Sequence, residues 1–170
     1  MRLTFPEDKI PQLAADYKLG LLEPAVIGMR YSVLLQGCLS RDQLYKVARW
    51  KSARSAEHVL KNSDEFIREV TRFALSTANE RARIEVLTVI DGVLWPTASV
   101  LLHLYHVDPY PILDFRALES VGEKVPNQYS FSFWWEYVQY CRKLALKRGI
   151  EMRELDRALW QHSVNVKSEA

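Results

Sequence analysis

Residues 90–118 read IDGVLWPTASVLLHLYHVDPYPILDFRAL, and this stretch decides the fold of the chain. It predicts the end of a helix, a tight turn at Gly92 and then a helix that is apolar on nearly every side. A loop with Pro109 and Pro111 follows, and Asp114 begins another helix. Because a helix without a polar face is buried in the middle of a domain, we expect the remaining helices to pack around this stretch. Any chemistry of the protein is expected here as well.

The turn alone is compatible with two interpretations. Gly92 can adopt the positive φ that most residues resist, and Pro96 suits the first turn of a helix. The backbone amides of residues 93–97 would then lie beside a helix N-terminus, which attracts a phosphate without a basic side chain. Many connections between helices have the same pattern and bind nothing, so both interpretations stay open at this point.

Together, the turn, the buried helix, the proline loop and the aspartate resemble the helix-hairpin-helix DNA glycosylase superfamily, in particular its endonuclease III-like members. The family hairpin reads Leu-Pro-Gly-Val-Gly-x-x-Thr-Ala, and residues 90–98 stand at these positions. Leu113 and Asp114 match the Val-Asp pair of the family, and Asp114 lies 18 positions after Pro96, as in endonuclease III-like members. The resemblance is good over residues 82–122 and general for the flanking helices.

This resemblance implies an all-α fold with two helical lobes around a cleft, in one domain over residues 1–170. The hairpin motif would span about residues 82–106, and the catalytic loop and its helix about residues 107–121. The implied partner is double-stranded DNA. In the hairpin, the residues expected to hold the DNA backbone are Gly92, Val93, Leu94, Trp95 and Thr97.

Asp114 is the expected catalytic residue. Cleavage of an N-glycosidic bond builds positive charge on the deoxyribose, and a fixed carboxylate can stabilise that charge and activate the attacking water. An aspartate that begins a helix can also be a simple N-cap. The two roles are compatible, because a cap would fix the position of the carboxylate.

Two positions depart from the family pattern. Pro96 stands where bifunctional members carry a lysine nucleophile, and proline has no side-chain amine to attack the sugar. The lysine-dependent lyase reaction therefore cannot use this position, and hydrolysis by water is expected. Leu94 replaces the second hairpin glycine. Lys51 is a candidate for a relocated amine nucleophile. A non-catalytic DNA-binding module of the same fold is the alternative function, and an all-α protein interaction domain is a third.

A glycosylase also needs a pocket for the extruded base, and aromatic side chains commonly form its walls. Trp50, Trp134 and Trp135 are the candidates in this chain. At helical spacing an aromatic residue is also a typical core residue. His103 and His106 lie one helical turn apart, but no third ligand is evident, so we expect core histidines and no metal.

Apolar spacing and capping residues predict further helices over residues 12–22, 24–36, 41–51, 65–76, 82–90, 130–147 and 152–162. The capping box that Ser40 and Gln43 form makes the helix over residues 41–51 the best defined. Basic residues gather on and after this helix, and they predict either a phosphate-facing surface or a solvated face: Arg41, Lys46, Arg49, Lys51 and Arg54. Beyond Ser163 a frayed tail is expected.

Composition adds little about function. Apolar residues make up 48% of the chain and charged residues 26%, as in ordinary globular proteins, and a net charge of +2 indicates no particular partner. Cys38 and Cys141 are too few for a cysteine-rich zinc or iron–sulfur site, and we expect both reduced and no cofactor. With no signal core and no membrane-spanning run, we expect a cytoplasmic, nucleoid-associated monomer without a membrane partner.

Overall fold

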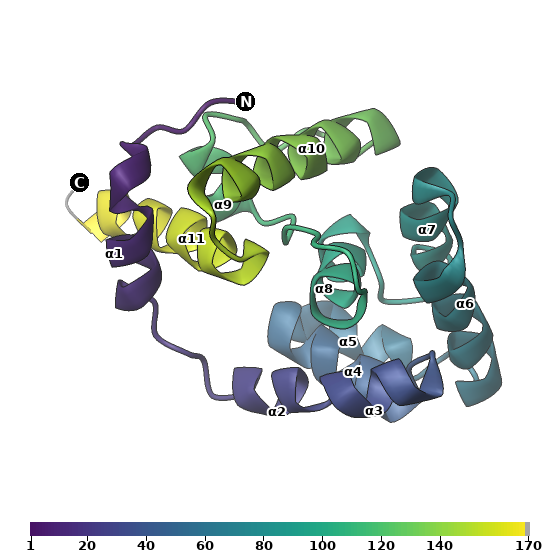
Figure 1. The fold of residues 1–170 in the computed structure, drawn as a ribbon. Coiled ribbons are helices and arrows are strands. Elements are labelled where there is room, and N and C mark those ends of the chain that lie inside the picture. Colours follow the sequence, from purple (N-terminus) through teal and green to yellow (C-terminus); the bar gives the residue numbers. More distant parts are fainter. Residues whose placement is uncertain (169–170) are drawn as a thin grey trace. The chain divides into compact units, whose positions relative to one another are not determined.

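The computed structural model describes residues 1–168, and this range is all-helical, as predicted (Figure 1). A short 3-10 helix, η1 (Glu7–Lys9), precedes the α-helices, which are α1 (Ile10–Asp16), α2 (Glu23–Gly28), α3 (Arg30–Gln36), α4 (Arg41–Lys51), α5 (Ala53–Val59), α6 (Asp64–Ser76), α7 (Glu80–Leu87), α8 (Trp95–Tyr105), α9 (Phe115–Ser120), α10 (Phe131–Arg148) and α11 (Met152–Ser168). None of these helices is both long and apolar enough to span a membrane.

The chain forms two compact helical units. Unit 1 comprises Met1–Lys18 and Pro109–Ala170, and unit 2 comprises Leu19–Asp108. The two units agree with the predicted pair of helical lobes. That residues 1–170 act as one domain stays a prediction.

In unit 2 the centre is α8, whose side chains are buried on nearly every face, as its sequence predicts. The last carbonyl groups of a helix have no partner within the helix, so a buried C-terminus needs donors from elsewhere. Arg30 on α3 supplies them, because its guanidinium donates to the carbonyl oxygens of Leu104 and of His106, the latter at 3.2 Å. The hydroxyl of Tyr105 donates to the carbonyl of Val26 on α2 at 2.8 Å. These bonds attach the end of α8 to α2 and α3.

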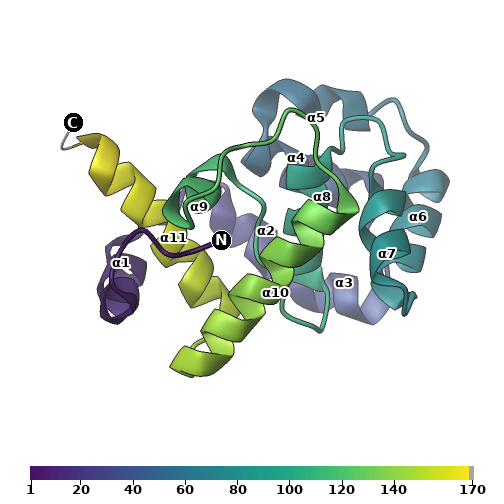
Figure 2. The ribbon, with the colours of Figure 1, turned by 90° about the horizontal axis from the view of Figure 1, so that it is seen from above.

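In unit 1, α11 is the common support. Both α1 and α9 pack against it, and the N-terminal segment lies beside α9 (Figures 1 and 2). The backbone N–H groups of Arg2 and Thr4 donate to the carbonyls of Val121 and Ser120 at 2.9 and 3.0 Å. The first residues of the chain are therefore bonded to the C-terminal end of α9.

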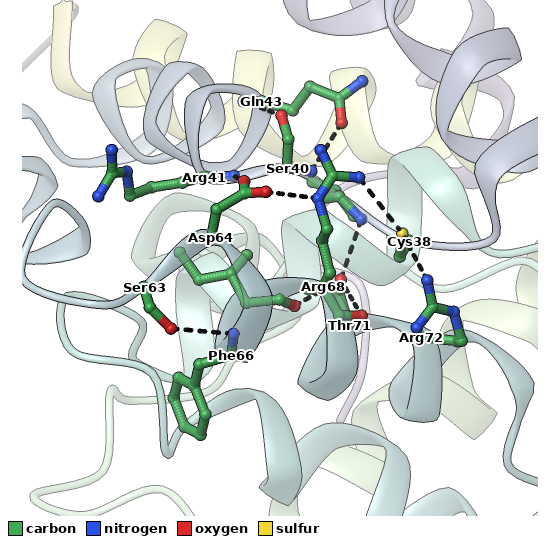
Figure 3. A network of polar contacts seen from close by, with 12 residues as sticks. Cys38, Ser40, Arg41, Gln43, Ser63, Asp64, Phe66, Arg68, Thr71 and Arg72 are labelled. Carbon is green, nitrogen blue, oxygen red and sulfur yellow. Dashed lines mark hydrogen bonds and ion pairs between the residues drawn. The ribbon is translucent and has the colours of Figure 1, made fainter.

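A polar network attaches the start of α4 to α6 (Figure 3). The Asp64 carboxylate accepts from the backbone N–H of Arg41 at 2.7 Å and from Nε of Arg68 at 2.5 Å. Nearby, the backbone N–H of Leu39 donates to the hydroxyl of Thr71 at 2.9 Å. The predicted capping box of Ser40 is present as well. The start of α4 is thus fixed by its own cap and by bonds to α6.

Several predicted boundaries in the N-terminal half are wrong. The helix expected over residues 12–22 ends at Asp16, because Tyr17 is extended. The helix expected over residues 24–36 divides into α2 and α3 after Gly28, a residue with low helix propensity. The sequence also gave no prediction of α5, a seven-residue helix whose N-cap makes no side-chain hydrogen bond.

At the other end, α11 continues to Ser168, so the expectation of a frayed tail beyond Ser163 is wrong for residues 164–168, and residues 169–170 lie outside the described range. The hydroxyl of Ser163 donates to the Glu119 carboxylate at 2.6 Å, and Nζ of Lys167 donates to it at 2.8 Å. These contacts with α9 order a segment that has no strong local signal of its own.

Cys38, Cys141 and His106 are buried, whereas His103 is only partly buried, so the expectation of core histidines is confirmed for His106 alone. Cys38 and Cys141 are both free thiols and both buried. His106 is buried, and its Nε2 lies 2.5 Å from a guanidinium nitrogen of Arg83, so it is a core histidine. Within residues 1–168 no three His, Cys, Asp or Glu side chains are placed to hold a metal ion.

The Asp64 network predicts a pH-dependent stability. The Arg41 N–H and the Arg68 guanidinium lower the pKa of the Asp64 carboxyl, so its contribution to stability is present above the unfolded pKa of about 3.9 and is lost as the pH falls through the folded pKa. We expect Asp64→Asn to lower the midpoint of thermal unfolding at about pH 7, and the difference from the parent to shrink below about pH 4. Thermal unfolding followed by circular dichroism measures both. Asp8→Asn, an exposed carboxylate in η1, is the control and should change neither value.

Candidate functional site

The predicted hairpin is present in unit 2 between α7 and α8. Helix α7 ends at Leu87, three residues before the predicted end, and a turn with a 3.0 Å hydrogen bond from Val93 N–H to the Ile90 carbonyl follows. The hydrogen bonds of α8 begin with Ala98 N–H, which donates to the Leu94 carbonyl at 2.9 Å. Helix, turn and helix therefore follow one another as the motif requires.

Gly92 is required in this turn for two reasons. Its φ is +88°, a conformation that other residues adopt with strain. A Cβ atom at this position would also lie 2.8 Å from the carbonyl oxygen of Ser55 and 2.8 Å from the backbone nitrogen of Val59. The turn therefore rests directly on the backbone of α5, the helix that the sequence did not reveal.

Asn62, which follows α5, holds the turn from the same side. Its Oδ1 accepts from the backbone N–H of Asp91 at 3.1 Å, and its Nδ2 donates to the Asp91 carbonyl at 3.1 Å and to the Val59 carbonyl at 3.0 Å. The side chain is buried, and Arg41 donates to its backbone carbonyl at 3.5 Å. The Asn62 amide thus binds both the backbone N–H and the carbonyl of Asp91, the residue before Gly92. The sequence places Asn62 just before α6 and does not indicate this contact.

The predicted hairpin residues differ in what they present to solvent. Val93 and Thr97 point into the core, with exposures of 1% and 3%, so only their backbone atoms can meet a ligand. Leu94 is 68% exposed, and Trp95 is partly exposed. Leu94 is the N-cap of α8 but makes no side-chain capping bond. The positive end of this eleven-residue helix therefore lies next to the turn, where an anion can be bound by backbone groups.

Asp114 in unit 1 is the N-cap of α9, as predicted. Its Oδ1 accepts from the backbone N–H of Arg116 at 2.9 Å, and the side chain is partly exposed. The pKa of Tyr129 is raised by burial and, to a smaller extent, by the negative charge of Asp114, so this phenol belongs to the surroundings of the carboxylate.

The loop before Asp114 is held by two buried side chains. The backbone N–H of Ile112 donates to Asp156 on α11 at 3.3 Å, and the hydroxyl of Tyr137 on α10 donates to the Ile112 carbonyl at 3.2 Å. Asp156 is itself bound by Arg153 at 2.6 Å. Burial raises the pKa of Tyr137 well above its ordinary value, so the phenol stays protonated and keeps donating. Both bonds act two residues before the candidate catalytic carboxylate.

The three tryptophans proposed as pocket walls have different environments. Trp134 is completely buried and stacks on Tyr110, with ring centres 5.8 Å apart, so it is a core residue of unit 1. Trp135 is partly exposed, and the Arg142 guanidinium lies 5.5 Å from its ring centre. Trp50 is partly exposed near the end of α4. Contact of any of them with a base stays a prediction.

Aromatic and cationic side chains that sequence reasoning missed follow Asp114. Phe115 is 45% exposed, and the guanidinium of Arg116 lies 5.0 Å from its ring centre and 5.4 Å from that of Trp160. Nζ of Lys167 is 5.0 Å from the centre of the Phe115 ring. Aromatic faces beside cations suit nucleotides, which combine a flat base with a charged phosphate. The order of α11 beyond Ser163 brings Lys167 here, which the sequence did not indicate.

Comparisons with known proteins support the fold. No protein-family model and no curated protein matches the sequence. The structure is similar to the crystal structure of Methanocaldococcus jannaschii 8-oxoguanine glycosylase/lyase in complex with a 15mer DNA containing 8-oxoguanine. The similarity has a TM-score of 0.53 at 19% sequence identity and covers 94% of this chain and 82% of that chain. The chain therefore has an all-helical fold similar to that of this glycosylase/lyase, in agreement with the fold expected from residues 90–118.

The Asn62 amide should be essential for the hairpin. We expect Asn62→Asp to destabilise the protein by about 1–3 kcal/mol, because two donated hydrogen bonds are lost and a carboxylate then faces two carbonyl oxygens. Chemical denaturation measures the loss, and hydrogen exchange should show faster exchange at the Asp91 amide. Asn79→Asp is a matched control, since Asn79 caps α7 by accepting from Ala82 N–H at 2.9 Å and a carboxylate accepts equally well. Equal effects in the two variants would contradict the role of Asn62.

Proposed function

We propose that this protein is a DNA glycosylase of the helix-hairpin-helix type. It binds double-stranded DNA through the hairpin and removes a damaged, mispaired or modified base by hydrolysis of the N-glycosidic bond. The proposal is carried by the carboxylate of Asp114, which is fixed as the N-cap of α9 behind a loop bonded on both sides at Ile112. A group held in this way loses little entropy when it acts on a substrate.

In the proposed reaction the bond between C1′ of the deoxyribose and the base nitrogen breaks, and the base leaves with the bonding electrons. The sugar acquires oxocarbenium character, and the negative charge of Asp114 stabilises it. The same carboxylate orients the water and accepts a proton from it as the water adds to C1′. The departing base nitrogen takes up a proton from solvent, and Asp114 returns the proton that it accepted to solvent. The products are the free base and an abasic site.

The hairpin supplies binding in this scheme. The turn at Gly92 and the positive end of α8 contact a phosphate through backbone groups. Because the turn rests on α5 and is held by Asn62, it meets the phosphate without rearranging. The target base leaves the stack for a pocket, and Trp135 and the aromatic residues around Arg116 are the side chains we assign to that step.

Two residues favour a second candidate, a DNA-binding module of the same fold that excises no base. Pro96 has no amine at the position of the family lysine, and Leu94 adds an exposed apolar side chain where the family has glycine. Binding to DNA with every base still attached, on all substrates tested, would favour this alternative. Fold alone supports both functions equally.

Asp114→Asn is the direct test of catalysis. Purified protein is incubated with lesion-bearing duplexes, and alkali then reveals abasic sites; 8-oxoguanine comes first because the similar structure holds that base. We expect the single-turnover rate of base release to fall by about 10²–10⁴-fold, while DNA binding is retained. Asp108→Asn, an exposed carboxylate near the other end of the proline loop, is the control and should keep the parental rate. Undiminished base release by Asp114→Asn would remove Asp114 from the reaction.

Trapping with borohydride tests the hydrolytic route separately. A lysine nucleophile forms a Schiff base that borohydride reduces to a stable protein–DNA complex, whereas hydrolysis by water gives none. We expect no trapped complex from the parent protein under conditions where it releases base. A complex that disappears in Lys51→Gln would instead assign a lyase reaction to Lys51.

A further inference from the structure

Beside the hairpin, α5 and the turn after it carry three exposed basic side chains. Ser55, Val59 and Asn62 are the residues through which α5 and the turn after it contact the hairpin. Arg54, His58 and Lys61 each stand one position before these three, and all of them are exposed. One residue corresponds to about 100° around a helix, so these basic side chains lie roughly a quarter turn from the line that supports the hairpin. We call Arg54, His58 and Lys61 the α5 strip.

The charges of the strip are not used by the fold. Among residues 1–168, no carboxylate forms an ion pair with Arg54 or Lys61. The acidic residue of α5, Glu57, is engaged by the hydroxyl of Tyr45 on α4 at 2.5 Å. The strip therefore offers long cationic side chains to an external anion.

The strip and the hairpin are held together as one surface. A Cβ at Gly92 would collide with backbone atoms of α5, so the two elements are in direct backbone contact, and the Asn62 amide adds bonds to both sides of Asp91. Hydrogen bonds from Lys61 N–H to His58 and from Asn62 N–H to Val59 continue the helical turn through the end of the strip. An anion at the N-terminus of α8 and anions along the strip would thus lie at fixed spacing.

We propose that the α5 strip binds phosphates of double-stranded DNA beside the phosphate held by the hairpin. This rests on the proposed DNA binding and extends it, because the phosphate contacts then come from side chains of α5 as well as from backbone groups of the hairpin. A regular row of anions is the partner that matches cations repeated along a helix and a neighbouring helix N-terminus. Contacts with phosphates set affinity and register and carry no base preference. The strip therefore acts on binding and leaves the choice of base and the chemical step unchanged.

Salt-dependent binding tests the strip. The affinity of the intact protein for a lesion-free fluorescent duplex is measured between about 50 and 200 mM salt, where each phosphate neutralised by a cation contributes about 0.9 to the slope of log affinity against log salt. We expect Arg54→Ala and Lys61→Ala each to reduce the slope by about 0.9, and the double variant by about 1.8.

A matched control distinguishes the loss of a phosphate contact from the mere loss of one positive charge. Arg81→Ala removes a cation that is 68% exposed at the far end of α7 from the hairpin. This control should keep the parental slope, and circular dichroism verifies that every variant is folded. Parental slopes in Arg54→Ala and Lys61→Ala, or an equal loss in Arg81→Ala, would overturn the strip while leaving DNA binding intact. A parent protein that does not bind duplex DNA would overturn the proposed function itself.

Discussion

The burial of α8 is the constraint on which the rest of unit 2 depends. A helix that is apolar on every side gains most of its stability from packing, yet its two ends carry backbone groups that need partners. At the C-terminal end Arg30 provides donors to the carbonyls of Leu104 and His106. The N-terminal end emerges at the hairpin. The helix therefore has one end that is neutralised inside the protein and one positive end at the turn, which is why the turn is the place where an anion can be bound.

In unit 1, the packing of the core determines the position of one carboxylate, that of Asp114. Asp114 lies after a loop whose prolines limit its freedom, and Ile112 is bonded through both its N–H and its carbonyl to buried residues of α10 and α11. The loop is further attached by Arg142, whose Nε donates to the Pro109 carbonyl at 2.8 Å. The position of the carboxylate thus depends on the buried side chains of Tyr137 and Asp156 and on Arg142. In the proposed function each unit has one role: unit 2 binds DNA through the hairpin, and unit 1 carries the reacting carboxylate.

What the sequence revealed was local. The Ser40 capping box, the glycine turn and the Asp114 cap are signalled within a few residues, and all three are present. Features that depend on distant segments were missed. Asn62 acts on a residue 29 positions away, and Lys167 is ordered by a carboxylate 48 positions away. No spacing rule connects such pairs, because only the packed structure brings them together. The short α5 was missed for a related reason, since its position under Gly92 has no sequence signal.

The discontinuity of unit 1 has a consequence for the order in which the protein is made. Its first segment, Met1–Lys18, bonds to the end of α9 and packs on α11, which belong to the last third of the chain. During synthesis this segment has to wait for its partners, while Ser55, Val59 and Asn62, which hold the hairpin turn, lie within Leu19–Asp108 and are available earlier. Because domains fold as units while the chain emerges, unit 2 can fold before the last segments of unit 1 have been made. In the proposed function, the hairpin would therefore form before the carboxylate that acts on the glycosidic bond is held in place.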